Sequence, residues 1–134
     1  MTDSEVKKLV EYWFATAEHD RETMEALYTT KRYDACLFFG HIILEKILKG
    51  LVVQETKQEA PYVHDLMKLS HEAGLNLSEE ELAFLALVNE FNIRARYPEH
   101  KLAFYKKCTK EYTDENVEKI KAMYQKLCQK IKHE

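Results

Sequence analysis

The sequence predicts an all-α protein, an up-and-down bundle of four to five helices that forms one domain over residues 1–134. Apolar residues recur at three- and four-residue steps through most of the chain, and no stretch shows the strict alternation of a half-buried strand. Only 3 Gly and 2 Pro interrupt 134 residues, so turns are few. A chain of this length has room for one core but not for two, and its short connections favour antiparallel neighbours.

The first helix is expected to begin at a capping box formed by Thr2 and Glu5 and to run to about Tyr28. Apolar side chains repeat through this stretch with the period of one helix face, which indicates an amphipathic helix packed on a core. Asp20 interrupts the apolar face. Burying an unpaired acid costs free energy. We therefore expect Asp20 either to pair with a basic side chain at the edge of the core or to lie where two helices leave it open to solvent.

The second helix, expected over residues 33–54, is apolar on nearly all sides. Such a helix needs neighbours all round, so it either occupies a central position or packs against a second chain. Its polar residues His41, Glu45 and Lys49 are spaced four apart along one line. The simplest interpretation is a solvated stripe with a weak Glu45–Lys49 pair worth roughly 0.3 kcal/mol. The alternative is that Glu45 and Lys49 belong to a binding site.

A third, short helix is expected over residues 63–73, where Gly74 stops it. A second capping box, formed by Ser78 and Glu81, opens the fourth helix with consecutive acids that suit the positive end of the helix dipole. This helix is expected to end near Arg96, because the residue before a proline avoids the helical conformation.

Two further segments complete the predicted bundle. Residues 102–108 are expected to form one or two helical turns. A last helix is expected to be capped by Thr113, which two acids follow. Its apolar face comprises Val117, Ile120, Tyr124, Leu127 and Ile131.

Composition and the N-terminal residues indicate a soluble, cytoplasmic protein. Apolar residues make up 46% and charged residues 32%, a balance typical of folded chains rather than disordered ones. The first residues, MTDSEVKKLVEYWF, lack the features of a secretory signal peptide. Charges interrupt the most apolar stretch, Ala35 to Val53, so we expect no membrane span. Reduced thiols are expected for the widely spaced Cys36, Cys108 and Cys128.

Charge is divided unevenly along the chain. Residues 1–93 carry 9 Lys and Arg against 17 Asp and Glu, whereas residues 94–111 carry 6 basic against 2 acidic residues. The remaining residues are nearly balanced, with 5 basic and 4 acidic. The segment 94–111 is therefore the one best suited to an anionic partner. Its basic residues are Arg94, Arg96, Lys101, Lys106, Lys107 and Lys110.

Several kinds of site are disfavoured. His64 and His71 are seven residues apart, and no His-x3-His or Glu-x2-His pair occurs on a helix to project two ligands inward, so we expect no metal site. P-loop and dinucleotide-binding folds need glycines after a strand, which this chain does not offer, and we expect no cofactor. A Ser/His/Asp or Cys/His nucleophile cannot be assigned from the sequence.

The sequence NIRARYPEH, residues 92–100, is the strongest candidate for chemistry. Cleaving RNA without a metal needs a group to remove the proton of the 2′-hydroxyl, a group to protonate the leaving oxygen, and positive charge on the phosphate. His100 suits proton transfer, and Arg94 and Arg96 suit the phosphate. One chain supplies a single histidine in this segment, but two-fold pairing through the second or fourth helix would bring two sets together.

Simpler interpretations of the same residues stay open. Basic side chains near a helix C-terminus are favoured by the dipole alone, by roughly 0.3 to 1 kcal/mol each, and proline commonly follows helix ends. An anionic contact without catalysis is a further alternative, since the excess of positive charge extends beyond the helix end to Lys110.

Four stretches of the chain form a recognisable set: Trp13 to Asp20, the segment FFGHIILEKILKGLV with Glu45, Lys46 and Lys49, the helix start at His64-Asp65-Leu66, and ARYPE. Together they resemble the HEPN domain family in its small stand-alone bacterial and archaeal form. The resemblance implies a helical bundle that forms homodimers, often paired with a small nucleotidyltransferase and commonly the toxin of a toxin–antitoxin system. Many members are metal-independent endoribonucleases with an arginine and a histidine, four to six residues between them, at the dimer interface.

Arg94 and His100, with five residues between them, satisfy that spacing. Ala95 stands where active members usually carry Asn, Asp or His, and Leu102 stands where some relatives carry a tyrosine that the partner modifies. The resemblance therefore favours anion binding over cleavage.

Two functional hypotheses emerge. The first is a dimeric HEPN protein that binds nucleic acid or a nucleotide and, if it cleaves RNA, uses Arg94, Arg96 and His100 as catalytic residues. The second is a catalytically inactive interaction protein that docks a minimal nucleotidyltransferase. The remaining candidate binding residues are Asn92, Tyr97, Lys101, Glu45 and Lys49.

Overall fold

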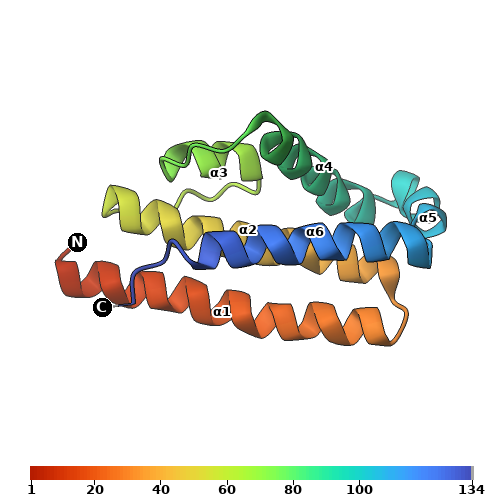
Figure 1. Cartoon of the computed structure of the whole chain (residues 1–134), viewed down its shortest axis with the longest axis horizontal. Helices are drawn as coiled ribbons and strands as arrows, with labels where there is room; N and C mark the ends of the chain where they lie inside the picture. Colours follow the sequence, from red (N-terminus) through yellow and green to blue (C-terminus); the bar gives the residue numbers. More distant parts are fainter. Residues whose placement is uncertain (134) are drawn as a thin grey trace.

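A computed structural model describes residues 1–133, which contain six helices and no strand (Figure 1). The prediction of an all-α bundle is confirmed, with six helices in place of the four to five expected. Successive long helices run in opposite directions along the molecule, as in an up-and-down bundle. The helices are α1 (Asp3–Thr29), α2 (Tyr33–Thr56), α3 (Leu66–Glu72), α4 (Glu79–Arg96), α5 (Pro98–Lys107) and α6 (Lys110–Cys128).

Helix α2 is the centre of the bundle. It packs against α1, α3, α4, α5 and α6, which accounts for a helix that is apolar on nearly all sides. Gly40 allows α6 to come close, because a Cβ atom at this position would collide with the side chain of Ile120. The fully buried side chains of α2 are those of Cys36, Leu37, Ile43, Leu44, Ile47, Leu48 and Val53.

Both predicted capping boxes are present. Thr2 and Glu5 exchange hydrogen bonds of 3.1 Å at the start of α1, and Ser78 and Glu81 exchange bonds of 2.9 and 3.1 Å at the start of α4. Each box satisfies two backbone N–H groups that the helix itself cannot pair. These local signals explain why the observed starts of α1 and α4 agree with the predicted ones.

Helix α3 begins later than predicted. The expected range was 63–73, but the helix starts at Leu66 because the side chain of Asp65 accepts hydrogen bonds from the backbone N–H groups of Met67 and Lys68. The three preceding residues, 63–65, therefore form a non-helical segment, the lead into α3.

The C-terminal third also differs from the prediction. Helix α5 spans ten residues rather than one or two turns after residue 102, because Pro98 fits the first helical turn, where a missing N–H is not needed. Helix α6 is capped by Thr109, whose side chain accepts from the N–H of Tyr112, and not by Thr113. Thr113 is instead fully buried within the helix.

Candidate functional site

The segment NIRARYPEH forms the junction between α4 and α5. Helix α4 ends at Arg96, as predicted. Tyr97 has an extended backbone, with φ −94° and ψ 127°, and is both the C-cap of α4 and the N-cap of α5. Pro98 opens α5 at once, so His100 and Lys101 lie in its first turn. The predicted catalytic residues are thus brought to one end of the bundle (Figure 1).

The two arginines lie on different sides of α4, because residues two apart are separated by about 200° around a helix. The Nη2 atom of Arg94 is 4.0 Å from Glu90 Oε2, and Arg94 borders a small hollow beside Tyr112 of α6. The Nη1 atom of Arg96 donates to Asn92 Oδ1 at 3.5 Å. Asn92 is only 9% exposed, so it supports Arg96 rather than offering an open contact of its own.

The first turn of α5 is open to solvent. Tyr97 is 51% exposed, and His100 and Lys101 are exposed as well. Within residues 1–133, no carboxylate pairs with Arg96, Lys101 or Lys106, and no side chain hydrogen-bonds the ring of His100. Positive charge at this end of the bundle is therefore available to an anion from outside the chain.

A second polar cluster lies where α1, α2 and the lead into α3 meet. The side chains of His41, Glu45 and Lys49 are 1%, 13% and 8% exposed, so the prediction of a solvated stripe is wrong. Lys49 Nζ lies 3.0 Å from Glu45 Oε2 and 5.5 Å from the ring centre of Trp13 on α1. The stripe is covered by neighbouring elements, and burial is tolerated because the two charges are in contact.

His64, in the lead into α3, completes this cluster. Its ring Nδ1 lies 2.8 Å from Glu45 Oε1, and because a carboxylate only accepts, Nδ1 carries the proton. The backbone carbonyl of His64 accepts a hydrogen bond of 2.9 Å from His41 Nε2. Burial lowers the pKa of His41 despite the nearby Glu45, so His41 is neutral at neutral pH.

Helix α4 joins the cluster through Asn89. The amide of Asn89 donates to Asp65 Oδ1 at 3.0 Å and accepts from the backbone N–H of Leu66 at 3.0 Å. Asn89, Asn92 and Arg96 recur at steps of three and four residues, so they share one face of α4. This face leads from the start of α3 to the arginine end of the helix.

Asp20, the acid on the apolar face of α1, has a basic partner. Lys46 of α2 forms an ion pair with it, which confirms the first of the two expected alternatives. The Asp20–Lys46 pair joins α1 to α2, whereas the ion pair of Glu45 with Lys49 lies within α2.

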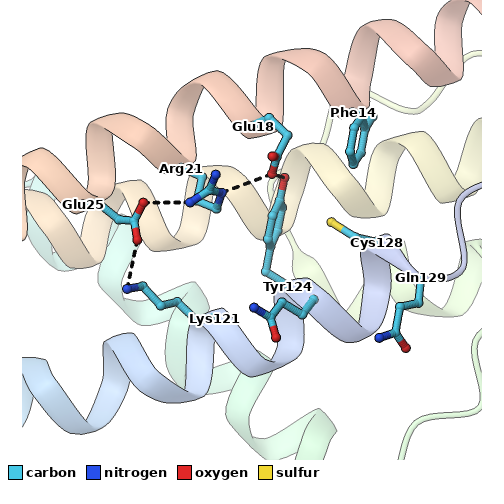
Figure 2. Close-up of a pocket in the computed structure, with 9 residues that line it drawn as sticks. Phe14, Glu18, Arg21, Glu25, Lys121, Tyr124, Cys128 and Gln129 are labelled. Atoms are coloured by element: carbon cyan, nitrogen blue, oxygen red, sulfur yellow. Dashed lines mark hydrogen bonds and ion pairs between the residues drawn. The ribbon is translucent and has the colours of Figure 1, made fainter.

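A larger hollow, of about 600 Å³, lies between α1 and α6 (Figure 2). Arg21 bridges Glu18 and Glu25 at 3.2 and 2.7 Å, and Lys121 reaches Glu25 at 3.0 Å. The hydroxyl of Tyr124 donates to Glu18 at 2.7 Å. The charged groups that line this hollow already neutralise one another, so it forms a paired seam rather than a place for an ionic ligand.

The thiols do not supply a nucleophile. Cys36 and Cys108 are buried, and burial raises the pKa of each thiol to about 12. A thiol with so high a pKa stays protonated at neutral pH and is a poor nucleophile. The three cysteines are free, as expected.

Within residues 1–133, no group of three or more His, Cys, Asp or Glu side chains is arranged to hold a metal ion. In the same part of the chain, no helix combines the length and the apolar character needed to cross a membrane.

His64 and Asn89 are polar residues that sequence reasoning did not place in a site. Their contacts join residues far apart in the chain: His64 is 19 residues from Glu45, and Asn89 is 24 residues from Asp65. The one local feature that could have indicated the position of His64 is Asp65. As the N-cap of α3, Asp65 sets the start of the helix and so places His64 in the non-helical segment before it.

A search of curated proteins and a search of solved structures found no match. The sequence model of the HEPN domain matches residues 10–133, nearly the whole chain. The chain therefore belongs to the HEPN domain family.

Proposed function

We propose that this protein binds RNA or a nucleotide at the exposed cationic end formed by the last turn of α4 and by α5. The observation that carries the proposal is the set of unpaired cations at Arg96, Lys101 and Lys106 in a segment with 6 basic and 2 acidic residues. A cation without an internal partner keeps its attraction for phosphate. Membership of the HEPN family supports a function connected with nucleotides or RNA in general.

In its enzymatic form, the proposal makes the protein a metal-independent endoribonuclease. Arg94 or Arg96 steadies the phosphate as negative charge builds up on it, and His100 transfers a proton. The exposure of His100 supports this role, since its ring is accessible to a bound strand. The product carries a 2′,3′-cyclic phosphate.

The test is incubation of the purified protein with structured RNA in EDTA, with mass spectrometry of the fragment ends. Cyclic phosphate ends from the wild type, and far fewer from His100→Ala, are expected. If the two proteins leave the RNA equally intact, the catalytic role of His100 is wrong.

We further propose that two chains pair at this end of the bundle. HEPN domains often dimerise. Large exposed apolar side chains occur here between the charges, namely Ile93, Tyr97, Leu102 and Tyr105, which are 49% to 63% exposed. A two-fold contact would bring two Arg94 and His100 sets together. Light scattering should give twice the chain mass for the wild type, and a monomer for Leu102→Glu.

The second candidate function is an inactive interaction protein that docks a minimal nucleotidyltransferase. The same exposed apolar side chains favour it, because a surface of Tyr and Leu among basic residues suits a protein partner as well as a second copy. Ala95, at the position next to Arg94, also favours it over catalysis. This alternative predicts co-purification with the partner, loss of the complex in Leu102→Glu, and no RNA cleavage.

The toxin role belongs to the enzymatic form. Expression of the wild type in a bacterial host should then arrest growth, and expression of His100→Ala should not. If both strains grow normally, the proposed toxin role is wrong, while the proposed binding of RNA still stands.

A further inference from the structure

We propose that a hollow at the end of the bundle opposite α5 binds a small molecule that carries two or more phosphate groups. The hollow has a volume of about 420 Å³, and its walls come from the start of α1, the end of α2 and the segment that follows α6. Both ends of the chain lie at this end of the molecule, and α5 lies at the other (Figure 1). The hollow is therefore separate from the RNA site proposed at the α4–α5 end.

Three lysines line the hollow, one from each of its walls. They are Lys7 of α1, Lys57 at the C-terminal cap of α2 and Lys132 of the C-terminal segment. Within residues 1–133, no carboxylate forms an ion pair with any of the three. Asp3 is the one acid among the described lining residues, so three cations and one anion give the lining a net charge of +2. Ammonium groups without an internal partner attract phosphate.

The wall that carries Lys132 is held in place by α2. The side chain of Gln54 donates from Nε2 to the carbonyl of Lys130 at 2.9 Å, and its Oε1 accepts from the backbone N–H of Lys132 at 2.8 Å. Ile131, between the two lysines, is only 6% exposed. Because these contacts already order the segment, a ligand does not have to supply the free energy for ordering it.

The floor of the hollow is apolar. Val6 and Val10, about one turn apart on α1, line it and are 6% and 3% exposed. Small-molecule sites typically have volumes of about 300–1,000 Å³ and combine apolar walls with a few polar groups. A strand of RNA needs a longer cationic groove that follows its backbone over several nucleotides. The size and the lining therefore favour a small polyphosphate over a strand.

The backbone of Lys57 allows a clean test of the hollow. Lys57 lies in the left-handed region, with φ 61° and ψ 24°, where glycine avoids the steric cost that a side chain carries. Lys57→Gly therefore removes a cation from the hollow without harming the fold. Lys31 provides the matched control, because it is a lysine with φ 62° in the turn between α1 and α2, outside the hollow.

The test is calorimetric titration of the full chain with inorganic tripolyphosphate at low salt. The wild type should bind it, and Lys57→Gly should raise the dissociation constant by at least about 10-fold, the scale of one lost hydrogen bond to a charged group. Lys132→Gln should do the same, and it keeps the backbone N–H that donates to Gln54. Lys31→Gly should match the wild type. Without ligand, the melting temperature of Lys57→Gly should be no lower than that of the wild type.

Two results of the titration would overturn the proposal. The first is a wild type that binds tripolyphosphate no more tightly than it binds sulfate. The second is an equal affinity for tripolyphosphate in Lys57→Gly and in Lys31→Gly.

A second measurement, the anisotropy of a labelled single-stranded RNA, distinguishes the two sources of phosphate. The affinity for RNA should be the same in the wild type and in Lys57→Gly, because the proposed RNA site lies at the other end of the bundle. If Lys57→Gly weakens the binding of RNA as much as that of tripolyphosphate, the hollow holds an RNA strand and the small-molecule proposal is wrong.

Discussion

The seam between α1 and α6 and the end of the bundle at α4 and α5 use similar charged side chains in opposite ways. In the seam, Arg21 and Lys121 are matched by Glu18 and Glu25 at hydrogen-bond distance. At the α4–α5 end, the neutral Asn92 is the only partner of Arg96 within residues 1–133. Paired charges hold helices together, whereas unpaired charges are left for a ligand.

The two regions also differ in how they are anchored. Helix α1 is anchored on α2 by several buried side chains and on α6 by the Lys121–Glu25 ion pair and by hydrogen bonds, whereas Phe104 is the single buried side chain of α5. Phe104 packs against Phe91 of α4, with 5.7 Å between ring centres. The attachment of α5, and with it the proposed binding surface, therefore depends mainly on the buried Phe104.

The largest effect is expected for Phe104→Ala. Removing a fully buried phenylalanine should lower the free energy of unfolding by about 3–5 kcal/mol. It should also weaken RNA binding, because α5 would lose its attachment to α4. Denaturant titration and fluorescence anisotropy measure the two effects. Tyr105→Ala, at a position 63% exposed, is the control for stability, and an equal loss of stability in both variants would contradict the anchoring role of Phe104.

A smaller effect is expected in the seam for Tyr124→Phe. The hydroxyl of Tyr124 donates to Glu18 at 2.7 Å, and a hydrogen bond to a charged group contributes about 1.5–3 kcal/mol. Chemical denaturation should show a loss within that range, while RNA affinity stays unchanged. Tyr33→Phe serves as the control. A change in RNA affinity in Tyr124→Phe would mean that the two regions are not independent.

The seam should also respond to acid. Burial alone raises the pKa of Glu18, but hydrogen bonds from Tyr124 and Arg21 outweigh it, so the pKa lies below its ordinary value of 4.5. A lowered pKa in the folded state contributes stability above about pH 4.5, and this contribution is lost as the pH falls through the folded-state pKa. In thermal melting from pH 7 to pH 3, the melting temperatures of the wild type and of Tyr124→Phe should approach each other as the pH falls. A constant difference would contradict the assignment.

The smallest effect on stability is expected for Arg96→Ala. Among the described residues, the Arg96 guanidinium makes a single long hydrogen bond, to a neutral side chain, so its removal should change the free energy of unfolding by no more than roughly 0.5 kcal/mol. The same denaturant titration measures it. A loss above 2 kcal/mol, the usual scale of a buried network, would show that Arg96 is structural.

Much of the fold could be predicted from local signals. The capping boxes at Thr2 and Ser78 fix the starts of α1 and α4, and the proline after Tyr97 fixes the end of α4. The start of α6 was predicted wrongly because Thr109 and Thr113 are both suitable caps, and packing against the core decides between them by burying Thr113.

The candidate site was predictable only in part. The cationic end is a contiguous segment, so its charge shows in the sequence. The polar cluster around Glu45 could not be predicted from the sequence. The four-residue spacing of His41, Glu45 and Lys49 does not reveal that the segment before α3 packs over these side chains. Which side of α4 each arginine occupies follows from helical geometry, but spacing alone does not tell that Arg94 lies beside Tyr112 of α6.

The central claim is that the unpaired cations of the α4–α5 end bind RNA and the paired cations elsewhere do not. The most direct measurement is the salt dependence of affinity for a labelled single-stranded RNA in Arg96→Ala/Lys101→Ala and in Lys119→Ala/Lys126→Ala, whose lysines pair with Glu115 and Glu81. The first variant should bind more weakly, with the slope of log affinity against log salt reduced by about 0.7 for each lost phosphate contact. The second should match the wild type, and equal slopes in the two variants would contradict the claim.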